Sequence, residues 1–275
     1  MKSIHQIALF FLVVSMSYAQ TKPNEVSKKP FSIGETLTFH SKILEEERVL
    51  NVYLPHNFSE EKEYPVIYLL DGSADEDFIH IAGLVQFGSF SWINMIPETI
   101  VIGIANVSRN RDFTYPSTDK EYVKKYPETG HSEKFIAFLE KELQPLVEKQ
   151  YPVTSEKTLI GQSLGGLVAT EILFKKPDLF KNYIIVSPSL WYDYESLLKR
   201  EPQSYDTEKS IYVAVGEEGN VMKRVAKQLH KKLEKSKKNN TTLYYHFLKE
   251  QDHGDALHLA VYDAFEKLFA SQEKK

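Results

Sequence analysis

A serine flanked by glycines near the middle of the chain has the spacing of a catalytic nucleophile. Gly161-Gln162-Ser163-Leu164-Gly165 matches G-x-S-x-G, a pattern in which a sharp turn between a strand and a helix exposes a serine hydroxyl. The apolar run TLIGQ precedes Ser163 and the helical pattern LGGLVATEILF follows it, as this turn requires. The free N–H groups at the start of such a helix favour a negatively charged oxygen nearby. The stretch therefore predicts nucleophilic catalysis by Ser163.

A serine hydroxyl needs a base that takes its proton. In the chain order serine, acid, histidine, the base follows Ser163, and four of the nine histidines do so: His230, His246, His253 and His258. His253 lies in the polar stretch KEQDHGDA, between the last predicted strand and the last predicted helix. This loop is expected at the same edge of the sheet as the serine, so His253 is the predicted general base.

A carboxylate must orient the histidine. Glu217 and Glu218 both follow the predicted strand SIYVAVG, and the residues alone do not separate them. Asp252 and Asp255 are alternatives, but they flank the histidine and are more typical of turn or helix-capping residues.

An oxyanion formed at the serine needs two N–H donors. The motif assigns one to the residue after the nucleophile, Leu164, and the other to the loop after the third strand. That strand is PVIYLL and the loop is DGSADEDF, which makes the N–H of Ser73 the second predicted donor.

The order of the apolar runs predicts an α/β fold that brings these residues together. Two runs at 36–44 and 48–55 predict an N-terminal antiparallel hairpin, and short β-branched runs predict parallel strands at 65–72, 99–106, 157–162, 181–187 and 210–216. A last strand is expected at 243–248. Helical patterns at 131–150, 164–175, 220–235 and 256–270 alternate with the later strands. The pattern favours a mostly parallel, doubly wound sheet in a single domain over residues 20–275. The long polar segment 107–130 follows a strand end and is a candidate binding element.

The first 19 residues have the composition of a secretory signal peptide. Lys2 precedes a short apolar run, and Ser17-Tyr18-Ala19 places small residues before a cut at Gln20. Loss of this segment removes one lysine and no acid, which changes the net charge from −4 to −5. The chain has no cysteine, so disulfides, zinc–thiolate sites and an N-terminal lipid-modified cysteine anchor are excluded. We expect an exported protein, periplasmic or secreted, with no stable membrane anchor and no nucleic-acid partner.

Several of these stretches together resemble bacterial esterases of the esterase D / enterochelin (ferric enterobactin) esterase type, in the α/β-hydrolase superfamily. They are YLLDG, VIGIANVSRNRDFTYP, GQSLGGLVATEILFKKPDLFKNYIIVSPSLWYD, VGEEG and DHG, and the resemblance runs from about Phe31 to the C-terminus.

This resemblance implies a role for further residues. It places the catalytic serine at Ser163 and the histidine at His253, and it favours Glu218 as the acid. It also implies that Arg109 or Arg111, in the family's R-x-R-D-x-T pattern, contacts substrate, and that Trp191 and Tyr192 line the acyl or leaving-group pocket. Many relatives have histidine where this chain has Gln162, whose side chain is expected to pack under the turn.

The sequence thus predicts an exported serine esterase that works through an acyl-enzyme on small esters, such as siderophores, acylated glycans or small acyl esters. The chemistry needs no metal or cofactor. Two alternatives are acyl transfer on the same triad and a non-catalytic siderophore- or glycan-binding protein on a hydrolase scaffold. A metal site from Asp252, His253, Asp255 and His258 is disfavoured, because it lacks the i, i+4 histidine pair of helical zinc sites.

Overall fold

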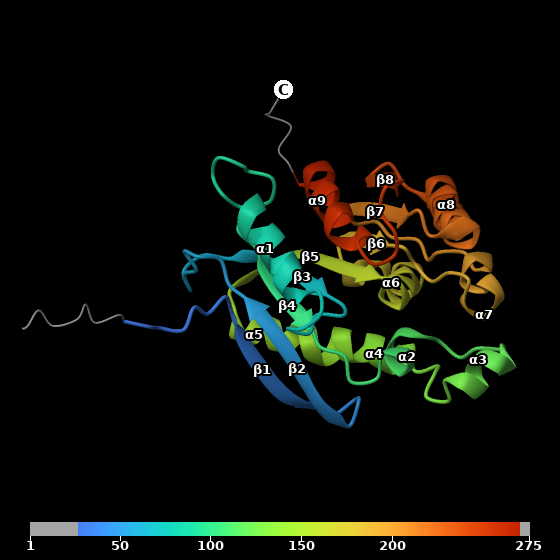
Figure 1. The fold of residues 1–275 in the computed structure, drawn as a ribbon, viewed down its shortest axis with the longest axis horizontal. Helices are drawn as coiled ribbons and strands as arrows, with labels where there is room; N and C mark the ends of the chain where they lie inside the picture. Colours follow the sequence, from blue (N-terminus) through green and yellow to red (C-terminus); the bar gives the residue numbers. More distant parts are fainter. Residues whose placement is uncertain (1–26, 270–275) are drawn as a thin grey trace, which may run out of the picture. The chain divides into compact units, whose positions relative to one another are not determined.

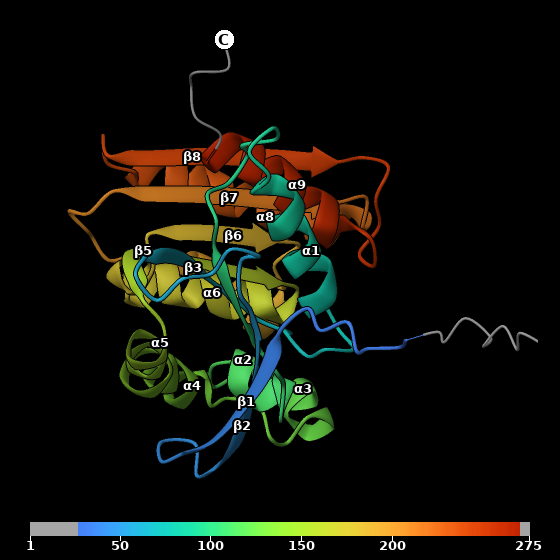
Figure 2. The same ribbon diagram turned by 90° about the vertical axis from the view of Figure 1, so that its left-hand side faces the viewer.

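The computed structural model of the protein describes residues 27–269, and the residues from Ile33 onward make up one compact unit. Within the described part of the chain, eight strands form one sheet in the order β1-β2-β4-β3-β5-β6-β7-β8 (Figures 1 and 2). The strands are β1 Glu35–Ser41, β2 Glu46–Tyr53, β3 Tyr64–Leu69, β4 Ile100–Ile104, β5 Val153–Gln162, β6 Asn182–Val186, β7 Lys209–Gly216 and β8 Thr241–Leu248. β2 is antiparallel to both of its neighbours, and all other pairs are parallel.

Burial along the strands follows from their place in the sheet. The central strands β4 and β6 are buried at every residue, which is why IVIGI and NYIIV read as continuous runs without alternation. The edge strands β1 and β8 are partly exposed along most of their length, and their sequences carry more polar residues. The predicted hairpin, the five predicted parallel strands and the last predicted strand are confirmed, and the last strand is parallel to its neighbour.

Helices cover both faces of the sheet (Figures 1 and 2). On one face, α1 (Phe78–Gly88) and α9 (Ala256–Leu268) bury their apolar sides in a shared cluster with the strands. On the other face lie α4 (Ser132–Phe138), α5 (Gln144–Gln150), α6 (Leu164–Lys175) and α8 (Gly219–Ser236). The predicted α/β-hydrolase architecture is therefore confirmed.

Four helical regions differ from the prediction. The helix α1 was not predicted, and the segment 107–130 carries the short helices α2 (Arg109–Phe113) and α3 (Lys120–Lys125) where only a loop was expected. The predicted helix at 131–150 contains a π-helical turn at Leu139–Leu143. Pro145, just beyond this turn, has no N–H to donate to the preceding turn of helix. A short helix α7 (Tyr192–Glu195) follows β6.

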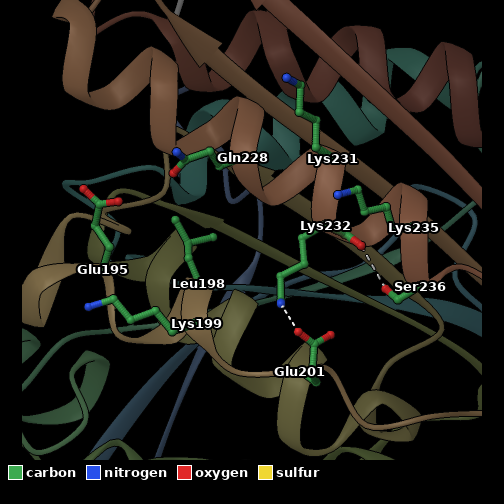
Figure 3. A pocket seen from close by; sticks show the side chains of 9 residues that line it. All are labelled: Glu195, Leu198, Lys199, Glu201, Gln228, Lys231, Lys232, Lys235 and Ser236. Atoms are coloured by element: carbon green, nitrogen blue, oxygen red, sulfur yellow. Dashed lines mark hydrogen bonds and ion pairs between the residues drawn. The ribbon is translucent and has the colours of Figure 1, made fainter.

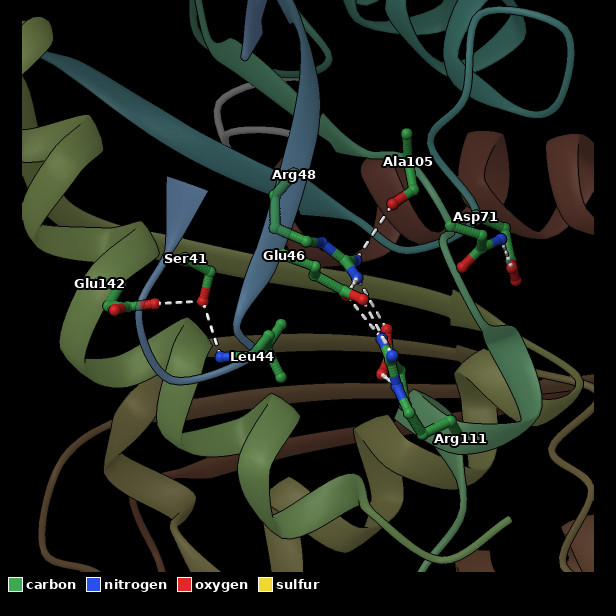
Figure 4. Close-up of polar contacts among 10 residues, drawn as sticks. Ser41, Leu44, Glu46, Arg48, Asp71, Ala105, Arg111 and Glu142 are labelled. Atoms are coloured by element: carbon green, nitrogen blue, oxygen red, sulfur yellow. Dashed lines mark hydrogen bonds and ion pairs between the residues drawn. The ribbon is translucent and has the colours of Figure 1, made fainter. Parts of the chain in front are cut away.

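A buried charge cluster fastens the N-terminal hairpin to α2 (Figure 4). The guanidinium of Arg48 lies 2.8 Å from Asp112 Oδ2 and 2.9 Å from Glu46 Oε1, and that of Arg111 lies 2.7 Å from Asp112 Oδ1 and 2.6 Å from Glu46 Oε1. The side chains of Arg48 and Asp112 are each 1% exposed. Two acids and two arginines therefore compensate one another around a buried pair, Arg48 and Asp112, while the side chains of Arg111 and Glu46 are 25% and 18% exposed.

We expect Asp112→Asn to lower the free energy of unfolding by about 3–5 kcal/mol, because it leaves two arginines short of a buried partner. Urea denaturation at neutral pH measures the change. The matched control is Asp206→Asn, which removes an acid that is 97% exposed and paired with Lys238. That variant should lose less than about 1 kcal/mol. Equal losses in the two variants would contradict the assigned role of the cluster.

Candidate active site

Ser163 sits on a strained turn between β5 and α6. Its backbone has φ 60° and ψ −119°, a conformation that non-glycine residues rarely adopt. The turn is held by three backbone hydrogen bonds: the Ser163 N–H donates to the Val186 carbonyl at 3.1 Å, and the Ser163 carbonyl accepts from Leu167 at 2.9 Å and from Ser189 at 3.0 Å. A Cβ at position 161 would lie 2.5 Å from the Gly165 carbonyl oxygen, so the turn requires glycine there. The surrounding backbone thus fixes the serine at the end of β5.

Glu218 is a buried carboxylate at the end of β7, and its side chain is 3% exposed. Its Oε2 lies 2.5 Å from His253 Nδ1, and its Oε1 accepts hydrogen bonds from the Gly216 N–H at 2.9 Å and from the Ser187 hydroxyl. Burial alone would raise the pKa of this carboxyl, but the hydrogen bonds from His253, Ser187 and Gly216 outweigh it and hold the pKa below its ordinary value. Glu218 is therefore ionised and oriented toward the imidazole.

His253 shares one cavity with Ser163. The hydrogen bond with Glu218 raises the pKa of the imidazole above its ordinary value, against the lowering effect of burial. Because Nδ1 is engaged by Glu218, the nitrogen left for proton transfer is Nε2. The cavity has a volume of about 360 Å³ and is lined by Asp71, Glu76, Asp77, Arg109, Gln162, Ser163 and His253. The Ser163 hydroxyl lies 3.3 Å from the Ser189 hydroxyl.

The other candidate acids are engaged elsewhere. Glu217 is exposed and forms an ion pair with Lys223. Asp252 accepts a hydrogen bond from the Gly254 N–H, and Asp255 accepts one from the Asp252 N–H, both at 2.7 Å. These two aspartates therefore shape the loop that carries His253, and the geometry separates the neighbouring glutamates in favour of Glu218.

Gln162 connects the turn to the histidine loop. Its side-chain amide donates a hydrogen bond to the backbone carbonyl of His253 at 2.7 Å, across 91 positions of sequence. The expectation that this side chain packs under the turn is wrong, since it lines the cavity and contacts the loop directly. No pattern in the sequence pointed to this contact, because an amide has many possible partners.

The two predicted oxyanion donors lie in different elements, Leu164 at the start of α6 and Ser73 in the turn after β3. Leu164 is the first residue of α6, where the N–H groups of a helix have no partner within the helix. Ser73 lies in the turn after β3. In this turn the Gly72 N–H donates to the Ile104 carbonyl at 3.0 Å, whereas the Ser73 N–H has no acceptor among residues 27–269. Ser73 is not one of the residues that line the cavity.

The two arginines of the R-x-R-D pattern point to different places. Arg109 lines the cavity and forms a two-pronged ion pair with Asp71, with Nε to Oδ1 at 2.6 Å and Nη2 to Oδ2 at 2.8 Å. Burial would lower the pKa of this guanidinium, but Asp71 raises it above its ordinary value. Arg111 is instead committed to Glu46 and Asp112 in the buried charge cluster, so the structure does not bring it to the cavity.

The predicted aromatic lining also differs from the structure. Tyr192 is fully buried, donates its hydroxyl hydrogen to the Tyr115 carbonyl at 2.7 Å, and packs edge-on against Tyr115 and Tyr122. It therefore supports the segment after β6 from the core and does not line the cavity. Trp191 is 38% exposed and lies near the ring of Tyr122, also outside the cavity lining. Three acids that the sequence analysis did not single out, Asp71, Glu76 and Asp77, line the cavity instead.

A second cavity lies far along α8 and holds none of the candidate catalytic residues (Figure 3). Its lining includes Lys231, Lys232 and Lys235, and Lys232 pairs with Glu201 at 2.5 Å. This arrangement is typical of a solvated charged surface. In the described residues 27–269, no helix combines the length and apolar character that crossing a bilayer requires.

One curated protein is similar to this chain in sequence, and two solved structures are similar to it in fold. Ferri-bacillibactin esterase BesA of Bacillus subtilis is 35% identical over 149 residues, which are 50% of this chain and 52% of that protein, so the chain spans about half the length of this curated relative. A solved structure of BES protein from Bacillus cereus is 26% identical with a TM-score of 0.79, and the match covers 90% of this chain and 98% of that one. An IroE-like serine hydrolase from Shewanella oneidensis is 30% identical with a TM-score of 0.76, over 86% and 80% of the two chains.

The match to a family model covers more of this chain than the match to BesA does. Residues 41–271 match the family described as "Putative esterase", which covers both the nucleophile turn and the histidine loop. The chain therefore belongs to this esterase family, of the enterochelin esterase-like type within the α/β-hydrolase fold.

Proposed function

We propose that the protein hydrolyses carboxylic esters through an acyl-enzyme, with Ser163 as nucleophile, His253 as general base and Glu218 as the residue that orients the imidazole. The observation that carries this proposal is the 2.5 Å contact between Glu218 and His253 Nδ1, together with the cavity that His253 and the strained Ser163 both line. A buried ionised acid, an imidazole with a raised pKa and a serine that lines the same cavity as the imidazole form the set that acyl transfer by a serine requires.

The reaction proceeds in two halves. As the Ser163 oxygen attacks the ester carbonyl, its proton passes to His253 Nε2, and the positive imidazolium is stabilised by Glu218. The N–H groups of Leu164 and Ser73 stabilise the oxyanion. His253 then protonates the departing alcohol, and a water molecule activated by the same imidazole releases the acyl group from Ser163.

Arg109 is the proposed substrate-contacting arginine. Its guanidinium lines the cavity, is fixed by Asp71 and donates a further hydrogen bond to the Gln162 carbonyl at 3.3 Å. The substrates are proposed to be esters of small molecules. The names of two relatives, a ferri-bacillibactin esterase and a siderophore triacetylfusarinine C esterase, support siderophore esters as members of this class.

We expect Ser163→Ala to lower kcat/KM for a simple ester by at least about 10³-fold, because it removes the nucleophile and leaves the rest of the cavity intact. Initial rates with a chromogenic ester measure the effect, and a fluorophosphonate probe should label the wild type but not the variant. Ser189→Ala is the matched control, since it removes the neighbouring hydroxyl and should remain labelled. An active, labelled Ser163→Ala protein would refute the proposal.

We expect Glu218→Gln to shift the pH profile as well as the rate. Because the hydrogen bond with Glu218 raises the pKa of His253, the wild-type kcat/KM should rise with pH around a midpoint above about 6.5, the ordinary imidazole pKa. Without the negative charge the imidazole pKa falls, so the midpoint should move to lower pH while the plateau drops by about 10²–10⁴-fold.

Glu217→Gln serves as the control for this experiment, because it removes an exposed charge one residue away. It should leave both the midpoint and the plateau near their wild-type values. If Glu217→Gln moved the profile and Glu218→Gln did not, the assignment of the acid would be reversed.

We propose further that the protein is exported, to the periplasm or to the medium. Support comes from residues 1–19, which lie outside the described residues and have the charged, apolar and small-residue regions of a signal peptide. Expression of the full chain in a Gram-negative host should yield a periplasmic or secreted protein that begins at Gln20, as measured by N-terminal sequencing. A cytoplasmic protein that retains Met1 or Lys2 would exclude export by this route.

A further inference from the structure

Asp77 is an acid without a partner in the wall of the catalytic cavity. It precedes α1 and its carboxylate does not cap that helix. Within residues 27–269 its carboxylate takes part in no hydrogen bond and no ion pair, although the side chain is only partly exposed and lines the cavity with Ser163 and His253. Its backbone is fixed, since the Asp77 N–H donates to the Asp71 carbonyl at 3.3 Å and its carbonyl accepts from Ile81 at 3.1 Å.

The acid Asp71, which lines the same cavity, differs from Asp77 because its carboxylate has several hydrogen-bond donors. It accepts two hydrogen bonds from Arg109, at 2.6 and 2.8 Å, and one from the Asn106 amide at 2.7 Å. Arg109 is thereby neutralised locally, and it is the only arginine or lysine in the cavity lining. Glu76 adds a further acid whose contact is the Asn106 amide at 3.3 Å.

The charge balance of the lining is therefore negative. One arginine is paired with one aspartate, and Glu76 and Asp77 remain without a cationic partner. Burial, followed by the nearby charges of Asp71 and Glu76, raises the pKa of Asp77 to about 6. The charges of His80 and Arg109 oppose this rise without cancelling it. A ligand with a hydrogen-bond donor would give the Asp77 carboxylate the hydrogen bond that it lacks within residues 27–269.

On this basis, and resting on the proposed esterase function, we infer that Asp77 determines substrate selection. The cavity accepts esters that carry a hydrogen-bond donor, such as a hydroxyl group, beside the scissile bond, and it disfavours esters that carry an anionic group there. The donor binds the Asp77 carboxylate while the ester carbonyl lies at Ser163. An anionic group in the same place faces Glu76 and Asp77, and the arginine of the lining is already paired with Asp71.

Two matched series of esters test this inference, one for each side of the ester bond. The acyl series is methyl butanoate, methyl 3-hydroxypropanoate and monomethyl succinate. The alcohol series is propyl butanoate, 2-hydroxyethyl butanoate and 2-carboxyethyl butanoate. Each series compares an alkyl, a hydroxyl and a carboxylate group at one position, and kcat/KM is measured by titration of the released acid.

In the wild type, we expect the hydroxyl member of at least one series to exceed the alkyl member by about tenfold, and the carboxylate member to fall below it by a similar factor. Asp77→Asn should raise kcat/KM for the carboxylate member about tenfold relative to the alkyl member. Asp77→Leu should also abolish the preference for the hydroxyl group. Asp75→Asn is the control, because Asp75 is an exposed acid two residues away that does not line the cavity, and it should leave all ratios unchanged.

The outcomes separate this inference from the function on which it rests. If the alkyl esters are hydrolysed in a Ser163-dependent manner but both series show the same ratios in wild type and Asp77→Asn, the inference is overturned and the esterase function stands. If none of the six esters is hydrolysed, the proposed function fails and the inference falls with it. A change of ratios in Asp75→Asn as large as in Asp77→Asn would also overturn the role of Asp77.

Discussion

The carboxylate of Glu218 holds three neighbouring strand ends of the sheet in one arrangement. One oxygen accepts from the Ser187 hydroxyl after β6 and from the Gly216 N–H at the end of β7, and the other contacts His253 in the loop after β8. Since these strands are parallel and adjacent, their carboxyl ends meet at one edge. A buried acid with this many donors stays ionised, and the position and basicity of the imidazole depend on it.

The R-x-R-D segment shows how one short motif serves two regions. Arg109 and Arg111 are two positions apart on α2, and residues at this spacing project from different sides of a helix. Arg109 thus reaches Asp71 and the Gln162 carbonyl at the cavity, while Arg111 reaches Glu46 on the hairpin. The helix therefore couples the nucleophile turn to the antiparallel edge of the sheet through charge pairs, and both arginines are structurally committed.

The strands and the main catalytic candidates were predictable because each depends on local sequence. The β-branched runs predicted the strands, and the strand ends predicted the places of Ser163, His253 and the neighbouring pair Glu217 and Glu218. Only the family resemblance favoured Glu218 within that pair. The roles of Arg111 and Tyr192 were not predictable, since they depend on Glu46, 65 positions away, and on the Tyr115 carbonyl, 77 positions away. The helix α1 was missed because its pattern, FIHIAGLVQFG, is apolar on several sides and lacks a capping side chain. Asp77 was missed because an unpaired acid has no sequence signature.

The hydrogen bond from the Gln162 amide to the His253 carbonyl joins the nucleophile turn directly to the histidine loop. A change in the length of the loop after β8 would carry that carbonyl away from the amide, and a shorter side chain at position 162 would no longer reach it. Related enzymes that differ at the second position of the pentapeptide should therefore differ in this loop as well. Grafting the loop from one such enzyme into another would succeed only when both parts are transferred together.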